Sequence, residues 1–494
     1  MFDWIQLKSG WLLWLFITMV IGGYLSYVMK FAEDKTALLP GVTTHGHYQI
    51  EMECQACHTN EEKENIFTSS GVSNAACNAC HAESLAAFSD SHPTRKFKNP
   101  ENAVFIQHIN ALECVTCHRE HNEKLTEPMG VTMPSDYCAH CHKVTLENLE
   151  SHKGLEFSSC ATSGCHNYHD NMALAPSFLR RHYGEPLLHP EAQVSELNAL
   201  SRWLADGNEK GEVLEVADAD APKSQSGDEA VLEDWAHSAH ARAGINCSAC
   251  HDAEDGAWVA QPDHRTCQSC HATEVADFLK GKHGMRLAHP GLSPMSPGMA
   301  RQSMRGDASH RTLTCSSCHG SHRYDRQQAA HLSCLQCHND THSLNYGNSA
   351  HYRFWKAELA GEVPAGSGVS CATCHLPREK RQGDAVVVNH DQSANLRPSD
   401  KMLQSVCLDC HGLQFAMDAL GEDDLVLSNF SRRPLVRHPG LNWAAESAIK
   451  RGDDRIAEIR KFLEAMPASG EGPVYPVSPI PLKEIEKKDD NPFE

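Results

Sequence analysis

Aromatic residues make up only 7% of this 494-residue chain, and apolar residues of all kinds make up 40%. Both fractions are below ordinary globular usage, so the polypeptide is short of material for cores of the usual size and something else must fill them. Basic residues are also few, with 44 Lys and Arg against 64 Asp and Glu and a net charge of −20, which argues against non-specific nucleic-acid binding. A single long apolar run and the lack of a short repeat exclude a polytopic membrane protein, a collagen and a coiled coil. The length predicts two or more domains.

Cysteine and histidine, in contrast, are abundant, with 22 and 33 residues. Every cysteine belongs to a pair that is followed directly by a histidine. Ten of these motifs read Cys-x-x-Cys-His, and the one that begins at Cys160 has a four-residue spacer. The cysteine pairs are Cys54 and Cys57, Cys77 and Cys80, Cys114 and Cys117, Cys138 and Cys141, Cys160 and Cys165, Cys247 and Cys250, Cys267 and Cys270, Cys315 and Cys318, Cys334 and Cys337, Cys371 and Cys374, and Cys407 and Cys410. The histidines that follow them are His58, His81, His118, His142, His166, His251, His271, His319, His338, His375 and His411.

The motif spacing has a chemical reason. Two thiols three positions apart can reach the two vinyl groups of one haem, and the adjacent histidine can place its imidazole on the iron. Zinc ribbons and disulfide frameworks also use Cys-x-x-Cys pairs, but eleven repeats with histidine in the same place favour haem, the wide motif at Cys160 included. Between about residues 45 and 440 the chain therefore resembles a multihaem c-type cytochrome, and the resemblance implies eleven covalently attached haem c groups.

The predicted fold is mostly α with extensive irregular loops, in a haem-packed architecture of two related multihaem modules behind one N-terminal transmembrane helix. Strand signals are nearly absent. Short helices are expected after haem motifs, at 84–91, 274–282 and 353–359, and a longer one at 443–464. The predicted division is a membrane anchor (1–35), a pentahaem module (36–204), an acidic flexible linker (205–234), a hexahaem module (235–465) and a proline-rich disordered tail (466–494).

The two modules share an order of features. Histidines precede the first motif of each half, and the third motif of each half continues as Cys-His-x-x-His, ending at His121 and His322. Both second motifs are followed by an aromatic residue and then a histidine, His92 or His283. This agreement predicts an ancient duplication of one module, with an added motif at Cys407.

The N-terminal apolar run predicts both an anchor and a compartment. From Trp11 to Met29 there are 19 residues without a charge, which as a helix span roughly 28 Å, about one hydrocarbon thickness. A cleaved signal peptide is the alternative, but residues 26–30 make a poor cleavage site. Because haem c is attached outside the cytoplasm, we expect a single-pass anchor in the inner membrane with the bulk of the chain in the periplasm.

Twenty-two histidines remain once the eleven motif histidines are subtracted from 33. They are enough to give every iron a second imidazole, which would make the haems low-spin and of low potential. The candidates for this distal position are His47, His92, His108, His121, His152, His182, His240, His283, His310, His322, His351 and His390. Methionine is the main alternative ligand. Four methionines gather at Met285, Met295, Met299 and Met304, where packing or a flexible lid is favoured over ligation.

The last third of the chain is where catalysis would be found. Segments 368–378, 389–398 and 405–412 resemble the closing haem region of the superfamily that contains hydroxylamine oxidoreductase and the pentahaem cytochrome c nitrite reductases. The resemblance implies His390 as a candidate for substrate protonation, although a distal-ligand or structural role is favoured. The lysine-ligated motif of those reductases is absent, and Tyr346 and Tyr352 are available for the tyrosine cross-link of the oxidoreductase.

The sequence thus favours an electron carrier over an enzyme. The expected donor is an inner-membrane quinol-oxidising partner, or quinol itself, and the expected acceptor is a periplasmic redox protein or terminal reductase. One alternative is an oxidoreductase that acts on nitrite, hydroxylamine or a similar small substrate at one open haem. Another is an electron-transfer subunit of a larger respiratory complex.

Overall fold

The computed structural model describes residues 2–32, 34–59, 72–86, 97–98, 110–126, 130–133, 168–169, 176–197, 207, 211–225, 227–252, 256–381, 385–396 and 400–465. The motifs that begin at Cys138 and Cys160 lie outside these ranges, as do the distal candidates His92, His108 and His152 and the predicted tail at 466–494.

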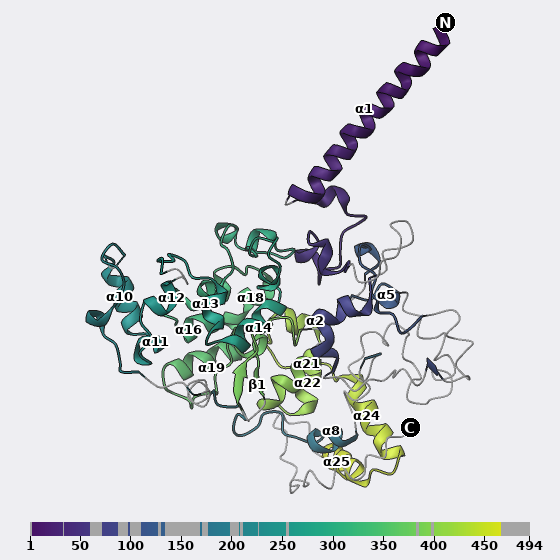
Figure 1. The fold of residues 1–494 in the computed structure, drawn as a ribbon. Helices are drawn as coiled ribbons and strands as arrows, with labels where there is room; N and C mark the ends of the chain where they lie inside the picture. The colour runs from purple at the N-terminus through teal and green to yellow at the C-terminus, as the bar shows by residue number, and fades with distance from the viewer. Residues whose placement is uncertain are drawn as a thin grey trace.

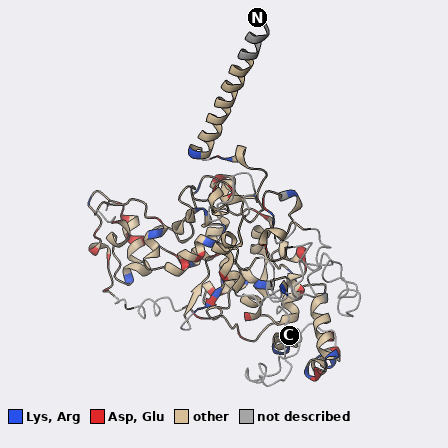
Figure 2. Ribbon diagram, turned by 45° about the vertical axis from the view of Figure 1, so that its right-hand side comes forward, with Lys and Arg blue, Asp and Glu red and all other residues tan. Residues whose placement is uncertain are grey.

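Helix α1 (Phe2–Phe31) stands apart from the body of the protein (Figure 1). Its segment Gly10–Phe31 is long and apolar enough to cross a membrane, and could serve as an anchor or a signal sequence. Trp11, Trp14 and Tyr24 are all more than half exposed, as expected for side chains that face lipid. Within its segment Gly10–Phe31, Figure 2 shows no charged residue until the end at the body, where Lys30 lies in the last turn.

The body consists of short helices and irregular loops, which confirms the predicted fold class. Its α-helices are α2 (Asn74–Ala86), α5 (Cys114–Cys117), α8 (Pro176–His182), α10 (Glu229–Ala236), α11 (Ala239–Arg242), α12 (Ser248–His251), α13 (His264–Gln268), α14 (Ala272–Lys280), α15 (Cys315–His319), α16 (Arg326–Ala330), α17 (Leu332–Leu335), α18 (Thr341–Asn345), α19 (Ala350–Leu359), α20 (Cys371–His375), α21 (Asp400–Ser405), α22 (Leu413–Leu420), α23 (Asp423–Leu427), α24 (Pro439–Lys450) and α25 (Asp454–Glu464). The 3₁₀ turns are η1 (Thr36–Leu38), η2 (Tyr48–Ile50), η3 (Cys54–Ala56), η5 (Glu123–Leu125), η9 (Val216–Asp218), η10 (Met285–Ala288), η11 (Pro297–Met299), η12 (Gly306–Ala308), η13 (Tyr346–Asn348) and η15 (Cys407–Asp409). Strands β1 (Arg378–Lys380) and β2 (Val386–Val388) form an antiparallel pair.

The long helix expected at 443–464 was a wrong prediction, because two helices, α24 and α25, occupy this region. Gly452 lies between them with φ 89°, a left-handed conformation that favours glycine and ends a helix. Asp453 then caps α25 by accepting the backbone N–H of Ile456. The helices expected at 274–282 and 353–359 are present as α14 and α19 with shifted ends, and α2 begins ahead of its haem motif.

A hydrophobic core joins α8, α22, α24 and α25 at the side of the body away from α1 (Figure 1). Cys407 and Leu408 of the last haem motif pack against it. Leu179, Leu413, Leu441 and Ile456 are at most 1% exposed within it. Since α8 lies in the predicted first module and the other three helices lie in the second, this core unites the two halves.

Further contacts join the halves near the haem motifs. The backbone N–H groups of His189 and Gln193 donate to the carbonyls of Cys410 and Asp409, each at 2.7 Å. Arg286 donates to the Gln49 carbonyl at 2.7 Å. The described parts of the two modules are therefore in direct contact.

The segment predicted as a flexible linker is partly packed, which corrects that prediction. Residues 211–225 run along α11 and α12, with the N–H of Leu214 donating to the Ala241 carbonyl at 3.0 Å. Asp220 accepts the N–H of Ser248 at 2.9 Å, and Asn246 donates to the Asp218 carbonyl at 2.7 Å. The aspartates that suggested a solvated linker instead cap neighbouring backbone groups.

Candidate haem sites

Each described Cys-x-x-Cys-His motif closes one helical turn. The N–H of the motif histidine donates to the carbonyl of the first cysteine, at 2.9 Å for His58, 2.8 Å for His271 and 2.9 Å for His338. This i to i+4 bond places both thiols and the imidazole on a single turn. The four-position offset between first cysteine and histidine is thus what positions three groups around one ligand.

Thiols of successive motifs lie next to one another. The thiol of Cys77 interacts with that of Cys114, the thiol of Cys267 with that of Cys315, and the thiol of Cys334 with that of Cys371. Groups attached at these thiols would be close neighbours along the chain of sites.

Eight motif histidines face a second histidine that belongs to no motif. The ring-centroid separations are 5.9 Å for His81 with His47, 6.2 Å for His118 with His169, 5.8 Å for His251 with His322, 6.1 Å for His271 with His240, 6.3 Å for His319 with His390, 6.1 Å for His338 with His283, 6.2 Å for His375 with His342, and 6.2 Å for His411 with His351. The sequence separation between the two histidines differs from pair to pair, but the distance between their rings is nearly the same in all eight.

This separation suits a metal ion held between two rings. A first-row metal bound to each imidazole nitrogen at about 2.0–2.1 Å, with each ring centre roughly 1 Å behind its nitrogen, places the centroids about 6 Å apart. Aromatic rings in direct contact have centroids about 4.5–7 Å apart, so the distance of one pair is not decisive. The recurrence of 5.8–6.3 Å in eight pairs, each with one motif histidine, is what points to a ligand between the rings. The residues present therefore fit a haem iron with two axial histidines.

Backbone carbonyls orient several of these rings. A carbonyl oxygen can only accept, so the Nδ1 of His251 donates to the Val259 carbonyl at 2.7 Å, and that of His390 donates to the Val388 carbonyl at 2.9 Å. His411 makes the same bond to the Leu187 carbonyl at 3.1 Å. With Nδ1 protonated, Nε2 is the nitrogen left to coordinate a metal.

The ring environment also favours neutral imidazole, the form that binds metal. The rings border an internal cavity but lie deep in the protein, and this burial lowers the pKa of His283, His319, His351 and His375 to about 4. The facing histidine lowers it further in each case, because two positive charges would repel.

A continuous cavity of about 4860 Å³ connects the sites. It is bordered by both members of every histidine pair except His411, and by cysteines from eight of the nine described motifs. A space of this size, lined by thiols and imidazoles, is where porphyrins would supply the apolar core that the composition lacks.

The distal candidates divide into three groups. His47, His240, His283, His322, His351 and His390 each face a motif histidine. His92, His108 and His152 lie outside the described residues. The remaining three are His121, His182 and His310.

None of these three faces a motif histidine within the described ranges. The ring of His182 packs on Phe178 with centroids 4.6 Å apart, and its Nδ1 bonds to Glu185 at 2.8 Å, so this histidine belongs to the core around α8. His310 is exposed. His121 borders the cavity, and its Nδ1 donates to the Gly41 carbonyl at 2.9 Å.

Two partners were missed from the sequence, His169 and His342. Each follows a motif histidine closely, at His166 and His338. His169 faces His118 and His342 faces His375, so each lies opposite the histidine of a motif other than the one it follows, and spacing alone did not reveal which.

The other candidates for redox chemistry have packing contacts. Met295 is only 4% exposed, whereas Met299 is 41% exposed. The rings of Tyr346 and Tyr352 lie 5.2 Å apart, and the Tyr346 hydroxyl donates to the Val369 carbonyl at 2.7 Å.

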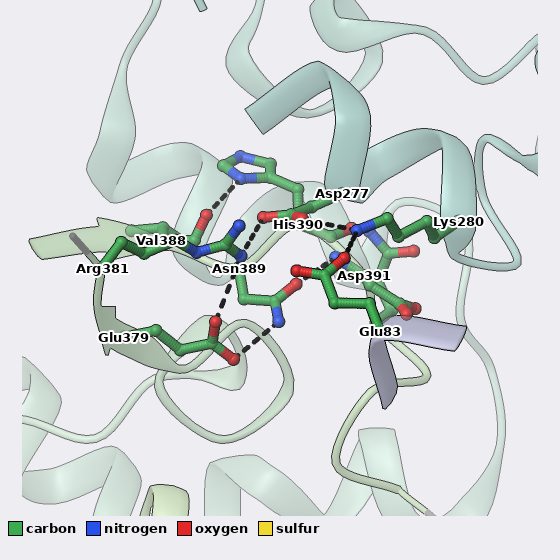
Figure 3. A network of polar contacts seen from close by, with 10 residues as sticks. Glu83, Asp277, Lys280, Glu379, Arg381, Val388, Asn389, His390 and Asp391 are labelled. Carbon is green, nitrogen blue, oxygen red and sulfur yellow. Dashed lines mark hydrogen bonds and ion pairs between the residues drawn. The ribbon is translucent and has the colours of Figure 1, made fainter. Parts of the chain in front are cut away.

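A charged network holds the segment that carries His390 (Figure 3). Beside His390, Asn389 donates to Glu379 at 2.7 Å, and Glu379 pairs with Arg381 at 3.2 Å. Arg381 in turn bonds to the buried Asp277 of α14 at 2.8 Å.

The same network reaches the first half of the chain. Lys280 lies 3.6 Å from Asp277 and 2.5 Å from Glu83 of α2. Burial raises the pKa of Asp277, although the charge of Arg381 opposes this shift. The position of His390 is thus tied to both modules.

A comparison with protein families bears on the N-terminal part of the body. Residues 46–143 match the family model described as Cytochrome c3. The matched range contains four of the motifs, from Cys54 to His142. The match supports a multihaem c-type cytochrome with covalently attached haem c and a role in electron transfer.

Proposed function

We propose that this chain is a membrane-anchored, periplasmic undecahaem cytochrome that relays electrons from the quinol pool or a membrane partner to a periplasmic acceptor. The eight facing histidine pairs carry this proposal, because a haem with both axial positions filled transfers electrons but has no open site for substrate. Each bound haem would supply an iron that takes up and gives up one electron.

The chain's own residues have three tasks in this function. The cysteines would hold each porphyrin covalently, the motif histidine and its facing partner would bind the iron, and backbone carbonyls keep the ring nitrogens aligned. The adjacent thiols of successive motifs, such as Cys267 and Cys315, would keep neighbouring porphyrins close enough for electrons to pass between them.

The direction of transfer follows from the anchor. With α1 in the inner membrane, the segment after it lies nearest the donor, and the side that carries α24 and α25 lies farthest away (Figure 1). A single helix offers no quinone pocket of its own, so a quinol-oxidising membrane partner is favoured over direct quinol oxidation.

Haem content provides the first test. Intact mass and pyridine haemochrome assays of the full-length protein should give eleven haems per chain, and the double variant Cys371→Ala/Cys374→Ala should give ten. The matched variant Ser316→Ala/Ser317→Ala, within another motif but retaining both of its cysteines, should keep eleven. Retention of all haem by the cysteine variant would contradict the proposal.

The donor can be tested with the same preparation. Purified protein mixed with a soluble quinol should be reduced slowly, and addition of quinol-oxidising membranes should accelerate the reduction. Equal rates with and without membranes would show that no membrane partner is needed.

A further inference from the structure

The loop between α23 and α24, residues 428–438, lies against two of the facing histidines and also exposes side chains to solvent. One face contacts the distal histidines of the last two haem motifs, and the other exposes apolar and arginine side chains. We propose that this Arg–Leu loop is the docking site for an acidic periplasmic redox protein that exchanges electrons with the C-terminal haems. The inference rests on the proposed electron-transfer function.

The inner face holds two of the facing histidines. Asn429 donates to the carbonyl of His342 at 3.0 Å, and the Nδ1 of His342 donates to the Val426 carbonyl at 2.5 Å. The ring of Phe430 lies 6.0 Å from that of His351. Asn429 and Phe430 of the loop, and Val426 at the end of α23, also border the haem cavity, so the loop lies directly beside it.

The outer face is apolar at its centre. Leu435 is 78% exposed and Val436 is 65% exposed, and neither borders the cavity. These are among the most exposed large apolar side chains outside α1, and exposed apolar residues of this kind, rimmed by polar ones, mark interaction sites.

The positive charge of the loop favours an acidic partner. The loop carries Arg432, Arg433 and Arg437, all exposed, and residues 428–438 include no acidic residue. In a chain with a net charge of −20, this segment is locally positive. An acidic partner would be repelled by most of the surface and attracted here, which is how charged proteins are steered to one patch.

The loop is also held in a fixed shape, which lowers the entropy cost of binding. Glu422 accepts the N–H groups of both Leu435 and Val436 and pairs with Arg432 at 2.8 Å. Asn429 and Phe430 have φ values of 52° and 54°, and this left-handed pair turns the chain between its inner and outer faces.

The electron balance of the exchange is simple. In one direction, a haem iron of the chain loses one electron and the docked partner gains it. In the other direction, the partner gives one electron to the iron through the same contact. No bond forms between the two proteins.

Stopped-flow reduction of the oxidised full-length protein tests the docking site, with the hydroquinone form of an acidic flavodoxin as the probe. Arg437→Glu should lower the second-order rate constant about tenfold at low ionic strength, and the difference should shrink as salt is raised. Leu435→Ala/Val436→Ala should lower the rate at all salt concentrations. The matched control Lys223→Glu makes the same charge change at an exposed residue elsewhere and should have much less effect.

Two results would overturn the docking proposal. One is an equal loss of rate in Arg437→Glu and Lys223→Glu. The other is a change of oligomeric state or of vesicle binding in Leu435→Ala/Val436→Ala, because a second copy or a membrane would then be the occupant. Reduction by the small cation hexaammineruthenium(II) separates the two proposals. If all variants react normally with it while either of these two results is obtained, the electron-transfer function stands and only the docking site is contradicted.

Discussion

His240 faces His271 with ring centroids 6.1 Å apart, and His47 faces His81 in the same way at 5.9 Å. In both halves a histidine that precedes the first motif lies opposite the histidine of the second motif. The ligand arrangement therefore repeats along with the sequence order, which supports the predicted duplication. The repeat also predicts the distal ligand of a motif histidine for which the described residues contain no facing histidine.

His58 is such a case. Its counterpart in the second half is His251, which faces His322, and the counterpart of His322 is His121. His121 and His322 share an unusual left-handed backbone, with φ 60° and 65°. We therefore expect His121 to be the distal ligand of the first haem.

Replacement of His121 by methionine tests this assignment. A thioether in place of an imidazole raises the haem potential, so His121→Met should shift one component of a potentiometric titration upward while the haem count stays at eleven. His310→Met, at an exposed histidine, is the control and should leave the titration unchanged. An unchanged titration of His121→Met would mean that the first haem has another ligand or an open position.

The core around α8 and α25 should make its own contribution to stability. Ile456 is 0% exposed there, so Ile456→Ala should cost about 2–5 kcal/mol through lost burial and a cavity. Haem content should not change. The exposed Leu435→Ala should alter stability by less than about 0.5 kcal/mol. Thermal unfolding followed by circular dichroism measures both, and similar midpoints for the two variants would argue against this core.

Asp277 should make stability depend on pH. Burial raises its folded-state pKa above its ordinary value, so its contribution is fully present below about pH 4 and is lost as pH rises through the higher folded-state pKa. Asparagine keeps an acceptor for Arg381 but does not titrate. Asp277→Asn should therefore unfold at the same temperature as the wild type at pH 4 and at a higher temperature at pH 7.

Asp307 provides the control for this experiment. It pairs with Arg305 at 2.9 Å on the exposed surface, where ion pairs contribute little. Asp307→Asn should not change the midpoint at either pH. If Asp277→Asn lowers stability at pH 7, the attraction of Arg381 and Lys280 outweighs the cost of burying the carboxylate.

The N-terminal helix predicts membrane attachment. Replacement of residues 1–35 by a cleavable secretion signal should release a haem-loaded protein into the soluble periplasmic fraction, whereas the natural chain should resist carbonate extraction from membranes. N-terminal sequencing of the natural mature protein tests the alternative. A mature chain that starts after residue 29 would identify a cleaved signal peptide and contradict the anchor.

The sequence predicted the local shape of the motifs well, because a motif such as Cys371 to His375 lies within one helical turn and needs no long-range information. It also predicted six of the histidines that face motif histidines in the structure. It missed His342 because that side chain serves the motif at Cys371 and not its neighbour at Cys334, and this depends on how the chain folds back. The core between α8 and α24 was missed for the same reason, since its two parts belong to different modules.

Electron paramagnetic resonance of the fully oxidised, full-length protein tests the central claim most directly. If every iron lies between two imidazoles, the spectrum should contain low-spin signals alone, and their integrated intensity should account for the haem content. A high-spin signal that integrates to one iron or more per chain would show an open coordination site and contradict the account of this protein as an electron conduit.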